Sequence, residues 1–461
     1  MKDLREFLIE CEERLPKEFV RVSEEVDPKY EISAIVKKLD LMGKHPLLYF
    51  EKVRGSTMPV VCNTDDSFTK FGLALGIPPD KVEDHYEKSE EECIRLNKYP
   101  VKEVKKSEAP CKEVIKIGEA ANLYEFPFLI HHEGEVPYLT RAIGVTKHEK
   151  ANCLHTAHYR LMIKKSNLGV THITPGRHLW DILNEREEKN KPLEIAFVLG
   201  VHPAWAMASQ SRMTHPPSEL DLAGSLLKES LEVVRCETID VLVPAWAEIV
   251  IEGEIPPNTV EDEGPWGDFT RYHQVAKRHP VKIKAITYRK NPIVHDMGAW
   301  PSTGYNVMAR IPQSLWMTRK LKEAVPDVTQ FRFGHTMCGL IQLDKKHVAQ
   351  PKQAILAAFG NDMYLKYVLC FDTDIDLAKG SEILWALMTR VQADRDIMVL
   401  PGVLGSDLDL SCPEESVQTK VGIDATAKPF RKDFPPERKI PDGIMGRIDL
   451  KHYVPNPEDY I

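Results

Sequence analysis

Apolar and polar residues alternate at two different spacings along the first ninety positions. One apolar stripe has helical spacing and consists of Leu4, Phe7, Leu8, Cys11 and Leu15, which predicts an N-terminal helix. Further helices are predicted over 31–40 and over 67–77, where a serine stands near the N-cap. Short apolar runs at 46–50 and 58–62 indicate buried strands. We therefore expect residues 1–110 to hold a small α/β domain.

A lysine-rich segment punctuated by proline, residues 98–114, is predicted to be a linker. Beyond it the pattern changes to short runs rich in β-branched residues, which are typical of strands. These runs lie at 142–149, 159–165, 193–201, 241–255 and 281–289. One helical run, 220–231, stands among them. We expect residues 111–312 to form a mostly β domain, for which a barrel is one arrangement.

Helical and strand-like runs alternate again from residue 313. Helices are predicted at 313–325, 351–360 and 381–392, and strands at 337–343 and 365–371. This alternation indicates a second α/β domain over 313–461. Its tail, from about 412, is rich in proline and charge and shows little periodicity.

Composition places the chain among soluble globular proteins. Of its 461 residues, 43% are hydrophobic and 28% are charged, and the length suits about three domains of roughly 150 residues. The net charge is −8. An acidic balance disfavours nucleic acid or an anionic membrane as the main partner, because both need a basic face.

No segment predicts export or membrane insertion. Apolar runs stay below the roughly 18 to 20 residues of a membrane span, and the charged first fifteen residues lack the apolar core of a signal peptide. The nine cysteines are scattered without a CxxC pair, which favours buried thiols over a disulfide framework. We expect a cytoplasmic protein.

The stretch "EDEGPWGDFTRY", residues 261–272, brackets a glycine- and proline-rich turn between Glu263 and Asp268. Paired acids can provide acid and base chemistry, although charged turns are also common on surfaces. Arg160 lies in the apolar run "YRLMI" and needs a partner if it is buried, because an unpaired buried charge is costly. An Arg160–Glu263 pair would keep Glu263 ionised, and Asp268 beside it could then carry a proton.

Histidine is concentrated in one region, since seven of the 17 lie between residues 131 and 178. His155 and His158 are three residues apart, which places them on opposite faces of a strand. This spacing alone is therefore only weak evidence for a metal site. His178 begins a predicted helix, whose exposed amides favour an anion such as phosphate. Glu219 follows the predicted N-cap Ser218, where it complements the helix dipole. Histidines packed in a β core stay open as the alternative.

Several of these segments together resemble the UbiD family of decarboxylases, which use prenylated FMN. "EGPWGDFTRYH" looks like that family's EGPFG(D/E) segment, and "PPSELDLAG" looks like the segment carrying its metal-binding glutamate. His178 follows Arg160 by 18 residues, the family's spacing from catalytic arginine to metal-binding histidine. Further similar segments are "VVRCETIDVLVPAWAEIVIEGEI", "DTDIDL" and "GIDATAKP". The resemblance runs along nearly the whole chain in the right order.

The resemblance implies an α+β fold and a set of site residues. An N-terminal α/β domain would precede a central split β-barrel that holds the flavin, and the C-terminal α/β domain would serve oligomerisation, as a dimer or hexamer. Arg160, Glu263 and Asp268 would be the Arg–Glu–acid catalytic set. His155, His178 and Glu219 would bind a divalent metal, usually manganese, that meets the cofactor phosphate, and the family allows a potassium ion. Residues implied to bind prenylated FMN are His155, Thr156, Ala157, His158, Tyr159, Arg160, Arg177, His178, Ser209 and Glu219.

The chain departs from the family pattern at two positions. His155 stands where an asparagine is common as third metal ligand, and Asn152 could compensate if the strand carries a bulge. Because imidazole is a different donor, metal identity and site geometry are open. Arg271 stands where glycine is common. Facing the pocket it would favour an anionic or phenolic substrate, and facing solvent it would have no such role.

The resemblance implies a reversible, non-oxidative decarboxylase of an aromatic, heteroaromatic or α,β-unsaturated carboxylic acid, acting through a covalent prenylated-FMN adduct. A flavin prenyltransferase would supply the cofactor. His295, Trp300 and Arg310 are candidates for substrate contact, and their polarity suggests a hydroxylated or dicarboxylic aromatic acid. Two other classes stay open: a metal-dependent hydrolase or lyase without flavin, and a non-catalytic subunit of a multi-protein carboxylase. The intact catalytic set argues against the second.

Overall fold

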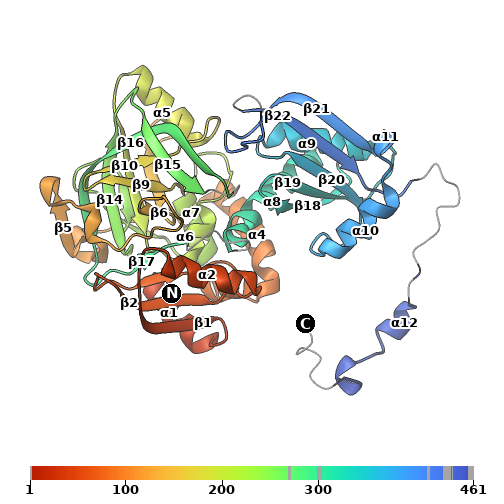
Figure 1. Ribbon diagram of the computed structural model, residues 1–461, viewed down its shortest axis with the longest axis horizontal. Coiled ribbons are helices and arrows are strands. Elements are labelled where there is room, and N and C mark those ends of the chain that lie inside the picture. Colours follow the sequence, from red (N-terminus) through yellow and green to blue (C-terminus); the bar gives the residue numbers. More distant parts are fainter. Residues whose placement is uncertain are drawn as a thin grey trace.

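The computed structural model describes residues 3–267, 271–297, 304–412, 416–428, 438 and 440–454. It has the α+β architecture expected from the sequence, with N-terminal, central and C-terminal parts (Figure 1). The N-terminal part, in red and orange, lies beneath the green and yellow central part, and the blue C-terminal part lies beside it. Within these ranges no helix is both long and apolar enough to cross a membrane. All nine cysteines are free, and six of them are buried, as predicted.

The N-terminal part contains the helices and strands that apolar spacing predicted. They are α1 (Leu4–Arg14), β1 (Phe19–Val26), α2 (Glu31–Leu41), β2 (Leu47–Val53), β3 (Val60–Cys62), α3 (Phe68–Leu75) and α4 (Val82–Leu96). Helix α1 starts at Asp3, whose side chain accepts from the Glu6 amide, and it buries four of the five predicted apolar positions. The Ser67 hydroxyl caps α3 in the same way, by accepting from the Lys70 amide.

One strand of the N-terminal sheet comes from far along the chain. The sheet order is β1-β2-β3-β17, and β17 (Val294–His295) pairs in parallel with β3, with Val294 opposite Val60. The segment after the acidic motif therefore returns to the first domain. This pairing fixes the position of His295 and of the residues that follow it.

A ten-stranded sheet dominates the central part. Its path is β6-β9-β10-β16-β14-β11-β7-β8, and β5 and β15 also pair with β16. The strands are β5 (Val114–Ile117), β6 (Tyr138–Leu139), β7 (Ile143–His148), β8 (Cys153–His158), β9 (Leu161–Lys165), β10 (Leu168–Thr171), β11 (Leu193–Leu199), β14 (Ile249–Ile255), β15 (Glu261–Gly267) and β16 (His273–Tyr288). The helices of this part are α5 (His178–Glu188), α6 (Pro203–Ala208) and α7 (Glu219–Leu227). Helix α7 starts at the predicted N-cap Ser218 in a capping box with Asp221.

The predicted linker at 98–114 is wrong in part, because the segment is built into the central domain. Strand β4 (Lys102–Glu103) pairs with β12 (Glu232–Arg235), which also pairs with β13 (Leu242–Pro244). Lys112 is buried and lies 3.2 Å from Glu252 Oε1. Lysine and proline indicated an exposed connection, but the ammonium group is matched by a carboxylate inside the protein.

The C-terminal part contains a five-stranded sheet of order β18-β19-β20-β22-β21. Its elements are α8 (Gly304–Ala324), β18 (Val328–His335), β19 (Cys338–Leu343), α9 (Gln350–Asn361), β20 (Tyr367–Asp372), α10 (Gly380–Arg390), α11 (Ala393–Asp396), β21 (Ile397–Leu404), β22 (Val417–Asp424) and α12 (Asp442–Met445). Helix α8 contacts α4 and α6, so it joins this part to the other two.

The prediction of a tail without periodic structure from residue 412 is wrong for β22. This strand lies between β20 and β21 in the sheet. Its buried positions include Gln418, Lys420 and Asp424, so polar side chains replace the apolar alternation by which a strand is recognised. The Lys420 ammonium donates to two backbone carbonyls, of Met363 at 2.9 Å and Leu365 at 2.8 Å.

Candidate active site

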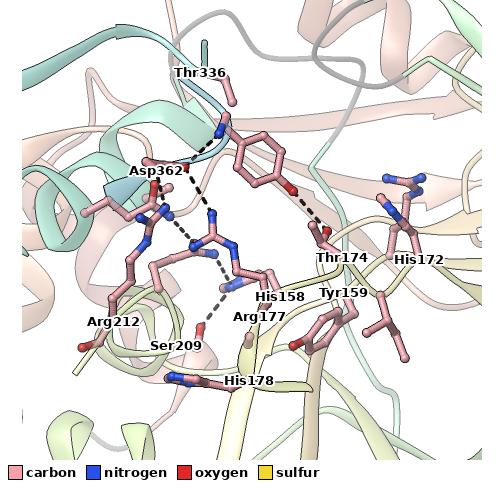
Figure 2. A pocket seen from close by; sticks show the side chains of 18 of the residues that line it. His158, Tyr159, His172, Thr174, Arg177, His178, Ser209, Arg212, Thr336 and Asp362 are labelled. Atoms are coloured by element: carbon pink, nitrogen blue, oxygen red, sulfur yellow. Dashed lines mark hydrogen bonds and ion pairs between the residues drawn. The ribbon is translucent and has the colours of Figure 1, made fainter. Parts of the chain in front are cut away.

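A cavity of about 540 Å³ lies where the central and C-terminal parts meet (Figure 2). Its volume is within the range of small-molecule and cofactor sites. The central part contributes residues from β8 and from the segments around α5 and α6, and the C-terminal part contributes residues of α8 and of the loop that follows α9. Neither part encloses this volume alone.

Arg160 and Glu263 form a two-pronged ion pair at the cavity. Arg160 Nε donates to Glu263 Oε1 at 2.6 Å, and Nη2 donates to Oε2 at 3.0 Å. Arg160 follows β8 and lines the cavity, whereas Glu263 on β15 is 3% exposed. The Arg160 guanidinium also lies over the ring of Trp266, 5.9 Å from its centroid. The structure thus brings together two of the three predicted catalytic residues.

The turn after Glu263 sets its position on β15. The register between β15 and β16 shifts between Glu263 and Trp266. Gly264 has a φ of 114°, a backbone conformation that favours glycine, and its amide donates to the sulfur of Met162 at 3.2 Å. Both the Glu263 carboxylate and the Trp266 ring therefore reach Arg160. Asp268 lies outside the described residues.

The charge state of Glu263 follows from its neighbours. Burial opposes the ionised form, but contact with Arg160 and the charges of His172 and Arg278 outweigh it and hold the pKa of Glu263 below its usual range. At neutral pH Glu263 is therefore a carboxylate, able to accept a proton but not to donate one.

A second carboxylate, Asp407 from the C-terminal part, balances the cations behind Glu263. Asp407 Oδ2 accepts from Arg278 Nη2 at 2.7 Å and lies 3.2 Å from His172 Nε2. Burial acts against the ionised form of Asp407, but His172 and Arg278 lower its pKa to about 2. Arg278 Nε lies 4.0 Å from Glu263 Oε2, so the two pairs form one network across the domain boundary.

Two arginines converge on a buried carboxylate at another wall of the cavity. Asp362 Oδ2 accepts from Arg212 Nη2 at 2.8 Å, and Asp362 Oδ1 lies 3.5 Å from Arg177 Nη2 (Figure 2). Arg177 also lies over the Tyr364 ring, and Arg212 over the Trp316 ring. One carboxylate faces two guanidinium groups and neutralises only one of their charges. A net positive charge therefore remains beside the cavity. Such a wall suits a phosphate.

His158 offers a polar atom without a protein partner in the described part of the chain. The Gln210 amide donates to His158 Nδ1 at 2.8 Å, and the Ser209 hydroxyl lies 3.0 Å from the same nitrogen. His158 Nε2 is buried and has no hydrogen-bond partner among the described residues. Burial and the charge of Arg141 hold the pKa of His158 well below its usual range, so the ring is neutral. A neutral ring that accepts at Nδ1 carries its hydrogen on Nε2 and can donate to a ligand.

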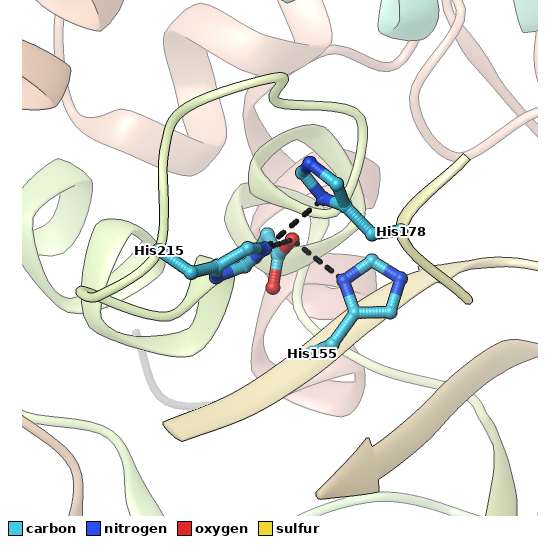
Figure 3. Close-up of side chains that lie close together, drawn as sticks. His155, His178 and His215 are labelled. Atoms are coloured by element: carbon cyan, nitrogen blue, oxygen red, sulfur yellow. Dashed lines mark hydrogen bonds and ion pairs between the residues drawn. The ribbon is translucent and has the colours of Figure 1, made fainter. Parts of the chain in front are cut away.

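Three histidines and a glutamate gather beside the same cavity (Figure 3). His155 on β8, His178 at the start of α5, His215 and Glu219 at the start of α7 place one donor atom each within 4.8 Å of the others. Burial opposes the ionised form of Glu219, but His155 and His215 outweigh it and hold the pKa of Glu219 below its usual range. Imidazole nitrogens and a carboxylate oxygen are the donors of divalent transition cations, so the group fits such an ion.

The other predicted site residues fall into three groups. Most of the predicted flavin-binding residues line the cavity, as does Arg310: these are His155, Ala157, His158, Tyr159, Arg160, Arg177, His178 and Ser209. Thr156 and Glu219 do not line it, because they lie buried behind this wall, where the Thr156 amide donates to Glu219 Oε2 at 2.9 Å. Asn152 occupies a turn before β8 with φ 49°. Trp300 lies outside the described residues.

Substrate contact by His295 was predicted from the sequence, but the structure places its side chain away from the cavity wall. His295 is 3% exposed, its Nε2 lies 2.9 Å from the Thr64 hydroxyl, and it does not line the cavity. The pairing of β17 with β3 draws the ring toward the N-terminal sheet. Arg271 is exposed and is also absent from the cavity wall.

Sequence reasoning missed several residues that the fold brings to the site. They are Gln210, Arg212, His215, Asp362 and Tyr364. His215 stands four residues before Glu219 in "HPPSE", a spacing that could have indicated a shared site. Asp362 and Tyr364 carry no local signal, because they approach from a different domain.

Three family models match the chain in order. They describe the N-terminal, Rift-related and C-terminal domains of 3-octaprenyl-4-hydroxybenzoate carboxy-lyase, and they match residues 14–88, 102–300 and 306–425. Together they cover most of the sequence.

Individual relatives agree with the family models. A phenolic acid decarboxylase of Sedimentibacter hydroxybenzoicus is 30% identical, with 96% of this chain and 95% of the relative covered. An anhydromevalonate phosphate decarboxylase of Methanothermobacter thermautotrophicus is 29% identical over 92% of this chain and 96% of the relative. The UbiD-class enzyme HmfF of Pelotomaculum thermopropionicum, solved with FMN, has a TM-score of 0.87 at 34% identity, covering 98% of this chain and all of that one. The chain therefore belongs to the UbiD family and, as in the relatives named for their activity, is a carboxy-lyase.

Proposed function

We propose that this chain is a reversible, non-oxidative decarboxylase that uses prenylated FMN and acts on an aromatic, heteroaromatic or α,β-unsaturated carboxylic acid. The observation that carries the proposal is the Arg160–Glu263 pair, held at 2.6 and 3.0 Å beside a cavity of about 540 Å³. Arg160 is partly buried and lines the cavity, where its guanidinium can bind a substrate carboxylate beside the ionised Glu263. Decarboxylation needs such an orienting cation and a nearby group that transfers protons.

The cavity has features that suit a flavin mononucleotide. Arg177 and Arg212 provide positive charge for the phosphate, and His158 Nε2 provides a buried donor without a partner among the described residues. HmfF, which is 34% identical, was solved in complex with FMN. When bound, prenylated FMN supplies the electron sink for loss of CO2 through a covalent bond to the substrate.

The chain's own residues bind, orient and move protons around that cofactor. Arg160 orients the substrate carboxylate while Glu263 keeps the guanidinium in place. Asp268, five residues later, donates a proton to the carbon that has lost CO2. Glu263 accepts a proton from solvent and passes it to Asp268, so that each turnover consumes one solvent proton. We expect Glu263 and Asp268 to titrate as a coupled pair, so that neither has a pKa of its own.

The remaining ligands follow the family resemblance. His155, His178 and Glu219 would hold a divalent cation next to the cofactor phosphate, with Mn²⁺ as the expected ion and K⁺ as a further one. A flavin prenyltransferase would supply the cofactor, and the chain would act in the cytoplasm as a homo-oligomer. Donor atoms within 4.8 Å of one another support the divalent site.

The position of Arg310 favours a narrower class of substrate. It lines the cavity from α8 and forms no ion pair within the described ranges. Burial lowers its pKa to about 10, so it stays protonated at neutral pH. A cation that is half-buried and unpaired is costly unless a ligand meets it. We therefore expect a substrate with a second anionic group, such as a dicarboxylic or phenolic aromatic acid.

The test is a substrate panel with loaded enzyme. The chain is co-expressed with a flavin prenyltransferase, and CO2 release and products are measured on aromatic mono- and dicarboxylic acids. We expect a flavin absorption spectrum and turnover that favours acids with a second anionic group. Turnover without bound flavin would instead identify a metal-dependent lyase, and flavin binding without turnover on any acid would indicate a non-catalytic subunit.

A further inference from the structure

We propose that His215 is a fourth protein ligand of the metal site, and that the resulting three-histidine, one-carboxylate set selects Zn²⁺ or Co²⁺ over Mn²⁺ and binds it without the flavin. The proposal concerns the four donors alone and stands whether or not the chain is a decarboxylase. It differs from the expectation for manganese held by His155, His178 and Glu219.

Three of the six donor separations match those around one small cation, and all four donor atoms lie within 4.8 Å of one another. His155 Nδ1 lies 3.1 Å from Glu219 Oε1, His215 Nε2 lies 3.3 Å from that oxygen, and His215 Nε2 lies 3.1 Å from His178 Nδ1. Two ligands of a tetrahedral ion with bonds of about 2.05 Å are about 3.3 Å apart. His215 is the donor that links the glutamate to His178, as the dashed lines in Figure 3 show.

The surroundings orient the donors toward their common centre. The Thr156 amide occupies Glu219 Oε2 at 2.9 Å, which leaves Oε1 for the group. His215 Nδ1 lies 3.2 Å from the Pro217 carbonyl, and a carbonyl only accepts. With its hydrogen on Nδ1, His215 would turn Nε2 inward as the atom available to a cation. Support of a metal-binding histidine by a carbonyl is the usual arrangement around such sites.

His155 is oriented in a similar way. Its Nε2 lies 3.3 Å from the Tyr159 hydroxyl, and its Nδ1 faces Glu219. The side chains of His155, His215 and Glu219 are only 5%, 4% and 2% exposed. His155 and His178 line the cavity, so an ion held here would lie at the cavity wall.

Ligand chemistry decides which ion binds. Affinity at nitrogen sites rises from Mn²⁺ through Co²⁺, and imidazole favours Zn²⁺ whereas carboxylate, carbonyl and water favour Mn²⁺. With three imidazoles and one carboxylate, this site belongs with the nitrogen-rich sites that favour Zn²⁺ and Co²⁺ over Mn²⁺. Because four donors come from the chain, the site needs no cofactor phosphate to hold its ion.

The experiment measures metal binding to the full chain expressed without a flavin prenyltransferase. After chelation, Zn²⁺, Co²⁺ and Mn²⁺ are titrated, with Co²⁺ followed by its visible absorption, which is strong for four or five ligands and weak for six. We expect one ion per chain, at least tenfold tighter binding of Zn²⁺ and Co²⁺ than of Mn²⁺, and intense Co²⁺ bands. His215→Gln should weaken Co²⁺ binding at least tenfold and reduce the band intensity.

The control is His148→Gln. The His148 ring lies edge-on to His215, 5.6 Å between centroids, but outside the donor group, so this variant should bind as the wild type does. Far-ultraviolet circular dichroism of the metal-free proteins checks folding, and His215→Asn replaces any variant that fails it. Unchanged Co²⁺ affinity in the folded His215 variants, or tighter binding of Mn²⁺ than of Co²⁺, would overturn the proposal. Neither readout involves turnover, so the proposed reaction is tested separately.

Discussion

The Asp362→Asn substitution removes the carboxylate on which two arginines converge across the domain boundary. Asparagine keeps the shape but cannot neutralise either guanidinium. The Arg212 side chain, at 2.8 Å, is 14% exposed, whereas Arg177, at 3.5 Å, is 31% exposed, and the Asp362 side chain itself is 1% exposed. The Arg212 pair is therefore the buried one, and its loss leaves a cation without a counter-charge.

The magnitude follows from that difference in burial. Breaking a buried pair by removing one partner costs about 3–5 kcal/mol, and an exposed pair contributes at most about 1 kcal/mol. Because Arg212 keeps slight solvent contact, we expect Asp362→Asn to lower the free energy of unfolding by about 3–4 kcal/mol. The matched control is Asp344→Asn in the same domain, which breaks an ion pair with Lys346 whose side chains are 57% and 60% exposed. It should cost less than about 1 kcal/mol.

The assay is urea unfolding at several pH values, followed by both tryptophan fluorescence and circular dichroism. The pKa of folded Asp362 is lowered: burial opposes its ionised form, but Arg212 and Arg177 outweigh burial. Its stabilisation is therefore fully present above the ordinary carboxyl range, near pH 4, and is lost as pH falls through the folded pKa. The difference in free energy of unfolding between wild type and Asp362→Asn should stay constant from pH 8 to pH 5. The reasoning would be refuted if Asp362→Asn lost no more free energy of unfolding than Asp344→Asn does, or if its loss grew on acidification.

Three further predictions concern charged residues at and behind the cavity wall. Glu263→Gln should lower CO2 release at least about a hundredfold while flavin absorbance is retained, because the base is lost but the cavity is not, and undiminished turnover would contradict its role. Arg310→Gln should reduce kcat/KM about 10- to 100-fold for acids with a second anionic group, the cost of a charged hydrogen bond, and should spare cinnamic acid, so an equal loss on both would count against it. Asp407→Asn should cost about 2–3 kcal/mol near pH 7, because a folded pKa of about 2 lies below the unfolded value near 3.9, and calorimetry should show that deficit shrinking below pH 4.

The sequence predicted elements well where one face is apolar and the other polar. Helix α1 buries Leu4, Phe7, Leu8 and Cys11 as its spacing indicates. Strand β22 was missed because its buried face carries Gln418 and Lys420, and such side chains are satisfied only by partners that the fold supplies. The buried Lys112, assigned to a linker, was misread for the same reason.

The site shows a similar division. Arg160 and Glu263 could be paired from sequence because an arginine in an apolar run requires a carboxylate, and the acidic motif offered one. His215 was missed because two prolines separate it from α7, so its spacing of four residues before Glu219 did not fall within the predicted helix. Asp362 lies 150 residues from Arg212, and only the packing of one domain on another brings such residues together.

The pairing of β17 with β3 has a consequence for how this protein can be divided. The domain order along the sequence suggests modules that could be cut apart, yet residues 294–295 complete the first sheet, and Met297, two positions later, lines the cavity. Removal of residues 1–110 would leave that strand without its neighbour and one wall of the cavity without an anchor. The N-terminal part is thus required for the site to form. A shortened chain that lacks it should fail to assemble the site, even though it keeps every predicted catalytic residue.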